Sequence, residues 1–191
     1  PREAKVDARY AERRVVAPGG GTLSAWHDAI GAAHTRARPD ARILSLVPSI
    51  TELLVDLDLG PNLVGRTTFC IHPSETVSEI PRVGGTKKPN FDRIRDLAPS
   101  HAIVNVDENR REDVDTLASL GTEVIVTHPI EPRDNLDLYT LVGGIFDRES
   151  EARALHDALA RELSLTAAAV KALPRRDVLY LIWREPWMTV S

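Results

Sequence analysis

From Arg42 onward, short apolar runs alternate with segments of helical period. Branched aliphatic residues fill the runs from Ile43 to Val47, from His101 to Val106 and from Val124 to Thr127. Such alternation is typical of βα units, in which parallel strands are linked by helices that pack on the sheet. The pattern predicts an α/β fold with a mostly parallel sheet flanked by helices, and Asn62 to Gly65 supplies a further short strand.

Capping and stop residues place the helices. Ser49 and Glu52 have the spacing of a capping box, ahead of a helix that is expected to end near Leu59, before Gly60 and Pro61. Three further helices are expected over Phe91 to Leu97 with Asn90 as cap, up to Leu120 with Gly121 as stop, and after the cap Asp134. The long irregular stretch from Arg66 to Pro89 is the kind of loop that displays binding residues.

One segment predicts an unusually long helix. Between Arg148 and Leu173 the chain contains no proline or glycine, and alanine, leucine and glutamate dominate. We expect a single helix of about 24 residues, spanning roughly 36 Å, which ends before Pro174. A strand from Val178 to Trp183 comes next, and it must either join the first sheet or belong to a second lobe, because a lone strand cannot satisfy its backbone.

The first forty residues differ from the rest, because Pro18 to Gly21 interrupts any early helix and the run that leads to Pro39 is rich in arginine and alanine. We expect a polar arm or linker, with a short helix around Ser24 to His34. The predicted organisation is therefore an arm over 1–40, an α/β lobe over 41–147, the long helix over 148–173 and the start of a second lobe over 174–191.

Composition narrows the function classes. Twenty-four basic and 28 acidic residues give a formal net charge of −4, which argues against a surface that binds nucleic acid through its phosphates. The single cysteine, Cys70, cannot form an intramolecular disulfide. No apolar run approaches the roughly 18 residues of a membrane span, and residues 1–20 lack the apolar core of a signal peptide.

Five blocks of sequence together resemble the helical-backbone metal receptors, the substrate-binding proteins of ABC importers for cobalamin and ferric siderophores. The blocks are Arg42–Glu52, Val64–Pro73, Val83–Thr86, Asn90–Ile94 and Tyr180–Thr189. The resemblance covers residues 41–191 and implies two α/β lobes joined by one rigid helix, with a metal chelate such as cobalamin, a ferric siderophore or haem held between them. It further implies a monomeric, non-enzymatic, periplasmic protein without an intrinsic cofactor, which docks onto an ABC transporter permease.

Candidate ligand-binding residues are selected by the rule that ligands of α/β folds gather at the carboxyl ends of strands. The resemblance adds Phe69 as the ligand-facing aromatic residue, and aromatic residues from the other lobe. The full set is Pro48, Ser49, Arg66, Phe69, His72, Thr86, Lys87, Glu108, Asn109, His128, Trp183 and Trp187. Phe69 stands where well-known cobalamin binders carry tyrosine, and Thr86 where they carry tryptophan, which weakens cobalamin as the ligand. Phe69 could instead pack beneath its loop.

Other residues keep two interpretations. Arg66, Lys87 and Lys88 suit a ligand with carboxylates or phosphate, but neighbouring lysines also form ordinary solvated loops. Cys70, His72 and His128 are metal-ligand types without the spacing of a metal site. The resemblance makes Asp92 a permease-docking carboxylate, although an acid in a first helical turn also stabilises the helix dipole.

No catalytic residues are expected, because no nucleophile motif and no phosphate-binding glycine loop occurs. Two alternatives to import stay open: a cytoplasmic protein of the same fold that handles or senses corrinoids or metal chelates, and an α/β enzyme that acts on a small phosphorylated substrate.

Overall fold

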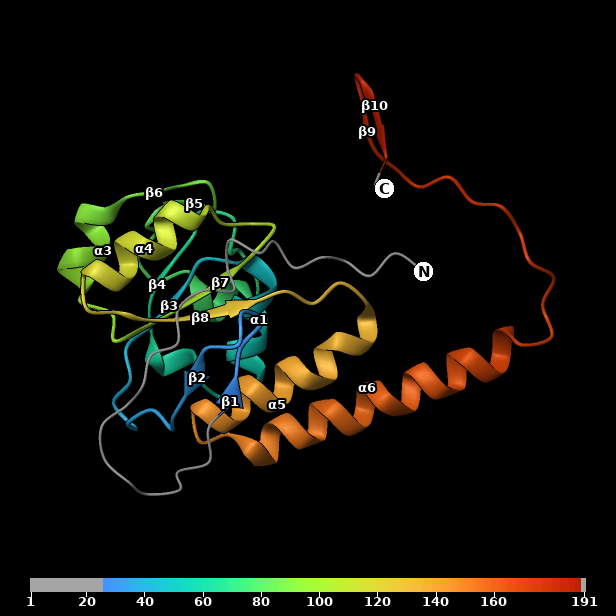
Figure 1. Ribbon diagram of the computed structural model, residues 1–191, viewed down its shortest axis with the longest axis horizontal. Helices are drawn as coiled ribbons and strands as arrows, with labels where there is room; N and C mark the ends of the chain where they lie inside the picture. Colours follow the sequence, from blue (N-terminus) through green and yellow to red (C-terminus); the bar gives the residue numbers. More distant parts are fainter. Residues whose placement is uncertain (1–25, 190–191) are drawn as a thin grey trace.

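The computed structural model describes residues 26–189, and its central element is a four-stranded parallel sheet (Figure 1). The strands are β3 (Ile43–Ser45), β4 (Leu63–Arg66), β7 (His101–Asn105) and β8 (Glu123–Thr127), in the order β4-β3-β7-β8. Every neighbouring pair is parallel. The predicted α/β fold with a parallel sheet is therefore confirmed.

Helices cover both faces of the sheet because side chains alternate along each strand. Ile43, Ile103 and Ile125 face α1 (Pro48–Asp56) and α5 (Asn135–Ile145), whereas Leu44 and Val104 face the opposite layer. That layer contains α3 (Phe91–Leu97) and α4 (Arg111–Ser119), which contribute Ile94 and Leu117 to its core. The result is a three-layer lobe that holds its strands, and hence their carboxyl ends, in fixed positions.

The helix caps agree with the sequence in part. Asn90 caps α3 as predicted, and its side chain accepts a hydrogen bond from the Arg93 amide at 3.0 Å. The capping box at Ser49 and Glu52 is wrong: Val47 is the N-cap of α1, without a side-chain cap. Pro48 takes the first helical position, where the amide that proline lacks would have no partner within the helix anyway, and Ser49 therefore lies in the first turn rather than at the cap.

One further helix boundary and one further cap differ from the prediction. Helix α1 ends at Asp56 rather than near Leu59, because Asp58 takes a left-handed conformation with φ of 56°. The turn η2 (Gly60–Asn62) then leads into β4. Asp134 occupies the N-cap of α5 but does not cap it, since its carboxylate accepts the amides of Ile130 and Glu131 instead.

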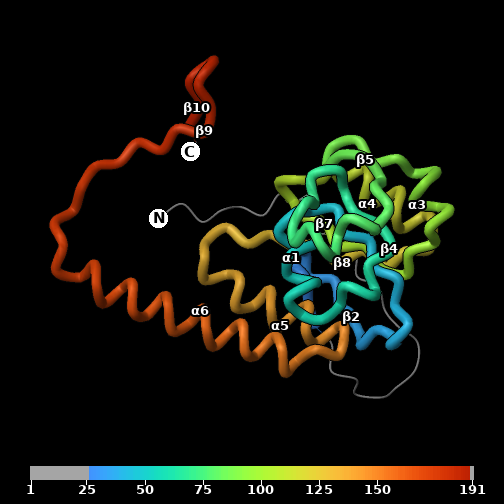
Figure 2. The backbone as a smooth tube through the Cα atoms, turned by 180° about the vertical axis from the view of Figure 1, so that it is seen from behind, coloured from blue at the N-terminus to red at the C-terminus, as the bar shows by residue number. Residues whose placement is uncertain are grey.

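The long helix is confirmed. Helix α6 (Glu149–Val170) runs without interruption for 22 residues, stops at Val170 rather than at the predicted Leu173, and extends well past the N-terminal end of α5 (Figures 1 and 2). Its first turns pack on α5 because Gly143 leaves room for Ala152: a Cβ at Gly143 would lie 2.4 Å from the Ala152 Cβ. Past Ala160, the side chains of α6 are mostly exposed.

The strand predicted after α6 belongs to a separate hairpin. Strand β9 (Leu181–Arg184) begins later than Val178 and pairs antiparallel with β10 (Trp187–Thr189). Neither strand pairs with the four-stranded sheet, so joining the first sheet is excluded. Figure 2 shows the hairpin away from the lobe, joined to the far end of α6 by an extended segment that turns back.

The segment before β3 is part of the lobe from Trp26 onward. The helix predicted around Ser24 to His34 is wrong for residues 26–34, which form a hairpin of β1 (Trp26–His27) and β2 (Ala33–His34). The amide of Ala29 donates to the Val126 carbonyl at 2.9 Å, and the Asp28 carboxylate accepts the Val126 amide at 3.0 Å. This segment therefore covers the open edge of β8. The rest of the predicted arm, residues 1–25, lies outside the described residues.

Candidate binding site at the carboxyl edge of the sheet

The carboxyl ends of the four strands meet at one edge of the sheet, and the loops after them form a rim. The rim consists of the β4 loop (67–73), the start of α1, the β7 loop (106–110) and the β8 loop (128–131), together with the turn between β5 (Gly84–Gly85) and β6 (Lys88–Pro89). In parallel α/β folds this edge is where ligands bind. Most of the predicted ligand-binding residues lie on these loops.

Phe69 stands out on the rim because it is exposed. Its exposed fraction is 60%, so it does not pack beneath its loop, which was the competing interpretation. The ring lies over Gly85, where an added Cβ would come within 3.3 Å of Phe69 Cε2. Ile71 in the same loop and Ile130 in the β8 loop are also exposed. Because β4 and β8 are the outer strands of the sheet, apolar groups are offered at both ends of the rim.

Arg66 is placed differently from the prediction. Its exposed fraction is only 1%, and its guanidinium group donates to the carbonyls of Val77 at 2.7 Å, Cys70 at 2.9 Å and Thr67 at 3.3 Å. The side chain is therefore committed to the backbone of the β4 loop. Direct contact between Arg66 and a ligand, as the sequence suggested, does not fit this geometry.

Asn109 and Thr86 are likewise buried and join neighbouring loops. The Asn109 amide donates to the carbonyls of Leu46 at 3.3 Å and Thr86 at 3.1 Å, and its oxygen accepts the Asn105 amide at 2.9 Å. These bonds tie the β5–β6 turn to the ends of β3 and β7. Lys87 in the same turn donates to the Asp107 carbonyl. Asn109 therefore supports the rim from below rather than facing a ligand.

The remaining candidates are spread along the rim. His128 is partly buried and lies 3.4 Å from the Asp107 carboxylate, while His72, Lys87 and Glu108 are exposed. Ser49 is exposed near Pro129 and Tyr139, in a shallow pocket of about 190 Å³. Pro48 is half-buried at the start of α1. Within residues 26–189, no group of three or more histidine, cysteine or acidic side chains is arranged to hold a metal ion.

Three predicted residues lie away from the rim. Trp183 and Trp187 are exposed on the β9–β10 hairpin, and Figure 1 shows this hairpin apart from the lobe. Asp92 is exposed in the first turn of α3, and Arg95 donates to it at 2.9 Å. This placement leaves Asp92 accessible to another protein.

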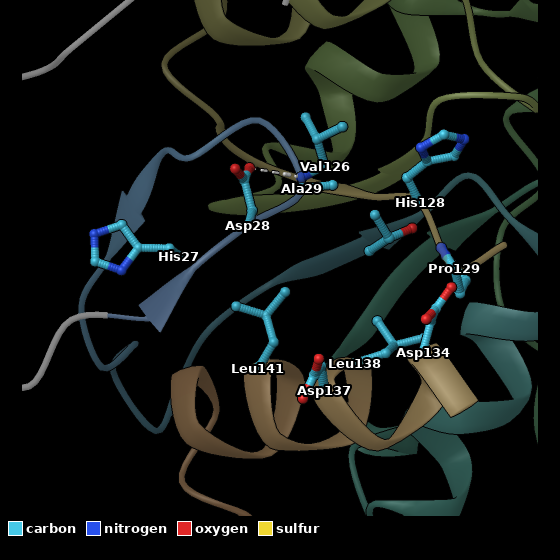
Figure 3. A pocket seen from close by; sticks show the side chains of 11 residues that line it. His27, Asp28, Ala29, Val126, His128, Pro129, Asp134, Asp137, Leu138 and Leu141 are labelled. Carbon is cyan, nitrogen blue, oxygen red and sulfur yellow. Dashed lines mark hydrogen bonds between the residues drawn. The ribbon is translucent and has the colours of Figure 1, made fainter. Parts of the chain in front are cut away.

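A pocket of about 310 Å³ beside β8 was not predicted (Figure 3). It lies between the N-terminal segment and α5, and its lining includes Asp28, His128, Asp134 and Asp137. Asp28 and Asp134 are engaged by backbone amides, and those bonds keep the pKa of Asp134 low. Asp28 therefore fixes the N-terminal segment against β8, and Asp134 fixes the β8 loop. The only sequence signal is the short polar turn around Asp28, which lies within the segment predicted as helix.

A buried charged cluster lies where the N-terminal hairpin meets β8. His34 lies 3.2 Å from Asp28 and 2.7 Å from Glu123, the first residue of β8. Burial alone would lower the pKa of His34, but the hydrogen bonds to both carboxylates outweigh it and raise the pKa to about 9. The same bond from His34 lowers the pKa of Glu123. Nearby, burial lowers the pKa of His101. This cluster attaches the N-terminal hairpin to β8, and it shares Asp28 with the pocket beside that strand.

The sequence of the chain matches the family model for periplasmic binding proteins over residues 43–189. The chain belongs to the periplasmic binding protein family. The match begins at the first residue of β3, runs through α6 and includes the β9–β10 hairpin. The resemblance drawn from the five sequence blocks is therefore confirmed.

Related proteins of this family carry names that refer to tetrapyrrole ligands. The chain is 30% identical over 93 residues to the vitamin B12-binding protein of Yersinia pestis (strain Pestoides F), an alignment that covers 49% of this chain and 33% of the relative. The same figures hold for the vitamin B12-binding protein of Yersinia pseudotuberculosis (strain IP 31758, serotype O:1b). The chain thus spans about one third of the length of these curated relatives.

Solved structures of periplasmic binding proteins share the fold. The vitamin B12-binding protein BtuF of Vibrio cholerae superimposes with a TM-score of 0.70 at 20% identity, covering 78% of this chain and 58% of that one. The heme-binding protein HmuT gives a TM-score of 0.64 at 21% identity, with 85% and 53% covered. At these identities the likeness concerns the fold, and the chain matches just over half of each structure.

Within the described residues, no helix combines the length and the apolar character that crossing a membrane would require.

Proposed function

We propose that this chain forms the N-terminal lobe and bridging helix of an ABC-importer substrate-binding protein, which captures cobalamin or a related metal chelate such as haem or a ferric siderophore. The observation that carries the proposal is the exposed Phe69 ring at the carboxyl edge of the sheet, on the lobe from which the unbroken helix α6 extends. We infer that this helix acts as a rigid spacer, which holds two lobes at a fixed distance with the ligand between their rims.

The chemistry of the rim supports a chelate with both apolar and polar parts. Phe69, Ile71 and Ile130 offer apolar surface at the outer strands, while Lys87, Glu108 and His128 offer charged and polar groups between them. A macrocycle of the corrin or porphyrin kind has a flat apolar face and polar substituents, which this distribution suits. The named ligands of the related proteins belong to the same class.

Membership of the family also supports a proposal for the compartment and the partner of the protein. We place the full-length protein in the periplasm, where it hands its ligand to an ABC permease and carries out no chemistry. The exposed Asp92 on α3 is our candidate for the carboxylate that docks onto the permease. The chelate is cargo rather than a resident cofactor, and the protein acts as a monomer.

Ligand titration of the full-length protein tests this proposal. Purified protein is titrated with cyanocobalamin, haem and a ferric siderophore, and binding is monitored by visible absorption and by calorimetry. We expect one of these chelates to bind with a dissociation constant of about 1 μM or below, which corresponds to roughly −8 kcal/mol. Absence of binding to all three would refute the proposal, whereas a preference for haem over cobalamin would fix the ligand class.

A further inference from the structure

The residue beneath Phe69 is a fully buried arginine. Arg66 ends β4, where its own amide donates to the Pro81 carbonyl and its carbonyl accepts the Val83 amide. Its guanidinium group reaches three further carbonyls, those of Thr67, Cys70 and Val77. Within residues 26–189 no ion pair with a carboxylate involves this group. Burying a cation without a charged partner is costly, and its hydrogen bonds to backbone carbonyls offset part of that cost.

The carbonyls of Thr67 and Cys70 are the two ends of the turn that presents Phe69, residues 67–70, which we call the Phe69 turn. Arg66 Nη1 bridges these two ends. Inside the turn, the Thr67 hydroxyl accepts the Phe69 amide at 3.2 Å and lies 3.0 Å from Cys70 Sγ. With its ends and its interior bonded, the turn has little freedom to move the ring.

A second set of contacts holds the Phe69 turn against the β5–β6 turn. The Thr68 amide donates to the Gly84 carbonyl at 2.7 Å, and the Phe69 ring lies over Gly85. Gly84 has a φ of 105°, and a Cβ there would lie 2.5 Å from the Lys88 carbonyl, so this partner turn is also fixed in shape. The exposed ring therefore rests on backbone from two loops, and Arg66 binds the first of them from within the core.

We propose that Arg66 is a positioning residue for ligand capture: through its bonds to Thr67, Cys70 and Val77 it holds the Phe69 turn in the shape that presents the aromatic ring. Arginine suits this role because its planar fork donates in several directions at once, which the single ammonium group of lysine cannot reproduce. The inference rests on the proposed function, because it takes Phe69 to be a residue that contacts the ligand. It does not rest on that function for its test, since ring position is measured without ligand.

Fluorine NMR of the full-length protein labelled with 4-fluorophenylalanine measures the ring position. The Phe69 resonance is assigned as the one lost in Phe69→Leu. We expect Arg66→Met and Arg66→Lys to shift or broaden this resonance, while the resonances of Phe91 and Phe146 stay unchanged. Arg93→Met is the matched control, because Arg93 is exposed and makes one bond to a backbone carbonyl, that of Arg82.

Titration with haem, cyanocobalamin and a ferric siderophore is then carried out on wild-type protein and the same variants. We expect affinity for the preferred chelate to fall about tenfold or more in Arg66→Lys and to stay at the wild-type level in Arg93→Met. A Phe69 resonance that is unchanged in a folded Arg66→Lys protein would overturn the inference. So would loss of the fold in both Arg66 variants, because Arg66 would then serve the whole lobe rather than the Phe69 turn. If wild-type protein binds none of the three chelates but the Phe69 resonance moves as expected, the proposed function fails and the positioning role stands.

Discussion

The imidazole of His34 lies 3.2 Å from the carboxylate of Asp28, and both side chains are buried where the N-terminal hairpin meets the sheet. Glu123 approaches the other ring nitrogen at 2.7 Å. His34 is therefore held as a cation between two carboxylates, and it links the segment before β3 to the first residue of β8. This pair makes the stability of the lobe dependent on pH.

The sign of that dependence is set by the pKa of His34, which is raised from 6.5 to about 9 in the folded protein. Stabilisation by the charged ring is fully present below the unfolded-state pKa and is lost as pH rises through the folded one. We expect the free energy of unfolding to fall by on the order of 2–3 kcal/mol between pH 6.5 and 9.5, because one pKa unit corresponds to about 1.4 kcal/mol. Urea titrations at several pH values measure this change.

His34→Gln should be less stable at pH 6.5 and should lose most of the decline between pH 6.5 and 9.5. His27→Gln, an exposed histidine in the same hairpin, is the control and should keep the decline. An equally steep decline in His34→Gln would show that another group carries it.

The indole of Trp26 packs so close to Gly144 that no room is left for a side chain at that position. A Cβ at Gly144 would lie 2.1 Å from the indole Nε1. Glycine to alanine within a helix ordinarily stabilises by about 0.5–1 kcal/mol, but here the ring would have to move. We expect Gly144→Ala to destabilise the protein by roughly 1–3 kcal/mol, the usual cost of overpacking, as measured by urea denaturation.

A double variant separates the two effects at Gly144. In the Trp26→Ala background the clash is absent, so Gly144→Ala should become neutral or stabilising. The same loss in both backgrounds would mean that the indole is not the obstacle.

Local signals predicted the elements of the fold well where neighbouring residues decide the structure. Asn90 before Phe91 and the uninterrupted run up to Val170 acted as expected, because capping and helix propensity are local properties. Prediction failed where a distant contact decides. The segment around Asp28 was expected to form a short helix, yet it forms a hairpin whose Asp28 carboxylate bonds to the Val126 amide, about a hundred residues further along the chain.

The candidate site was predicted at the level of loops rather than side chains. Arg66, Asn109 and Phe69 were all predicted to bind ligand because they lie at or just after strand ends. The sequence does not reveal which of these side chains points into the core. Burial separates them: Arg66 and Asn109 are inside the lobe, and Phe69 is exposed. The carboxylates around the pocket beside β8 were not predicted to lie together: Asp28 bonds to the amide of Val126, far along the chain, and Asp134, predicted only as a helix cap, bonds to the nearby amides of Ile130 and Glu131.

Asn109 should prove essential to the shape of the rim. Its amide nitrogen donates to two carbonyls in different segments, that of Leu46 just after β3 and that of Thr86 in the β5–β6 turn. Asn109→Asp keeps the size but replaces the donor with an acceptor, so two buried carbonyls lose their partner. We expect a loss of about 1–3 kcal/mol in the free energy of unfolding, the usual cost of unsatisfied buried groups. Glu108→Gln, exposed next to it, should change stability by less than about 0.5 kcal/mol.

Phe69 gives the most direct test of the rim as a ligand surface. The exposed ring contributes little to the core, so Phe69→Ala should leave the free energy of unfolding within about 0.5 kcal/mol of wild type. Loss of an aromatic contact with a flat macrocycle should nevertheless weaken chelate binding by about 1–2 kcal/mol, or roughly 5- to 30-fold.

Phe69→Tyr keeps the ring and should bind as wild type does. Phe91→Leu removes a half-buried ring on α3, away from the rim, and should leave affinity unchanged. Calorimetry on the four proteins decides the matter: equal affinity in Phe69→Ala and wild type would remove Phe69 from the ligand site, because the stability measurement would already have excluded a folding defect.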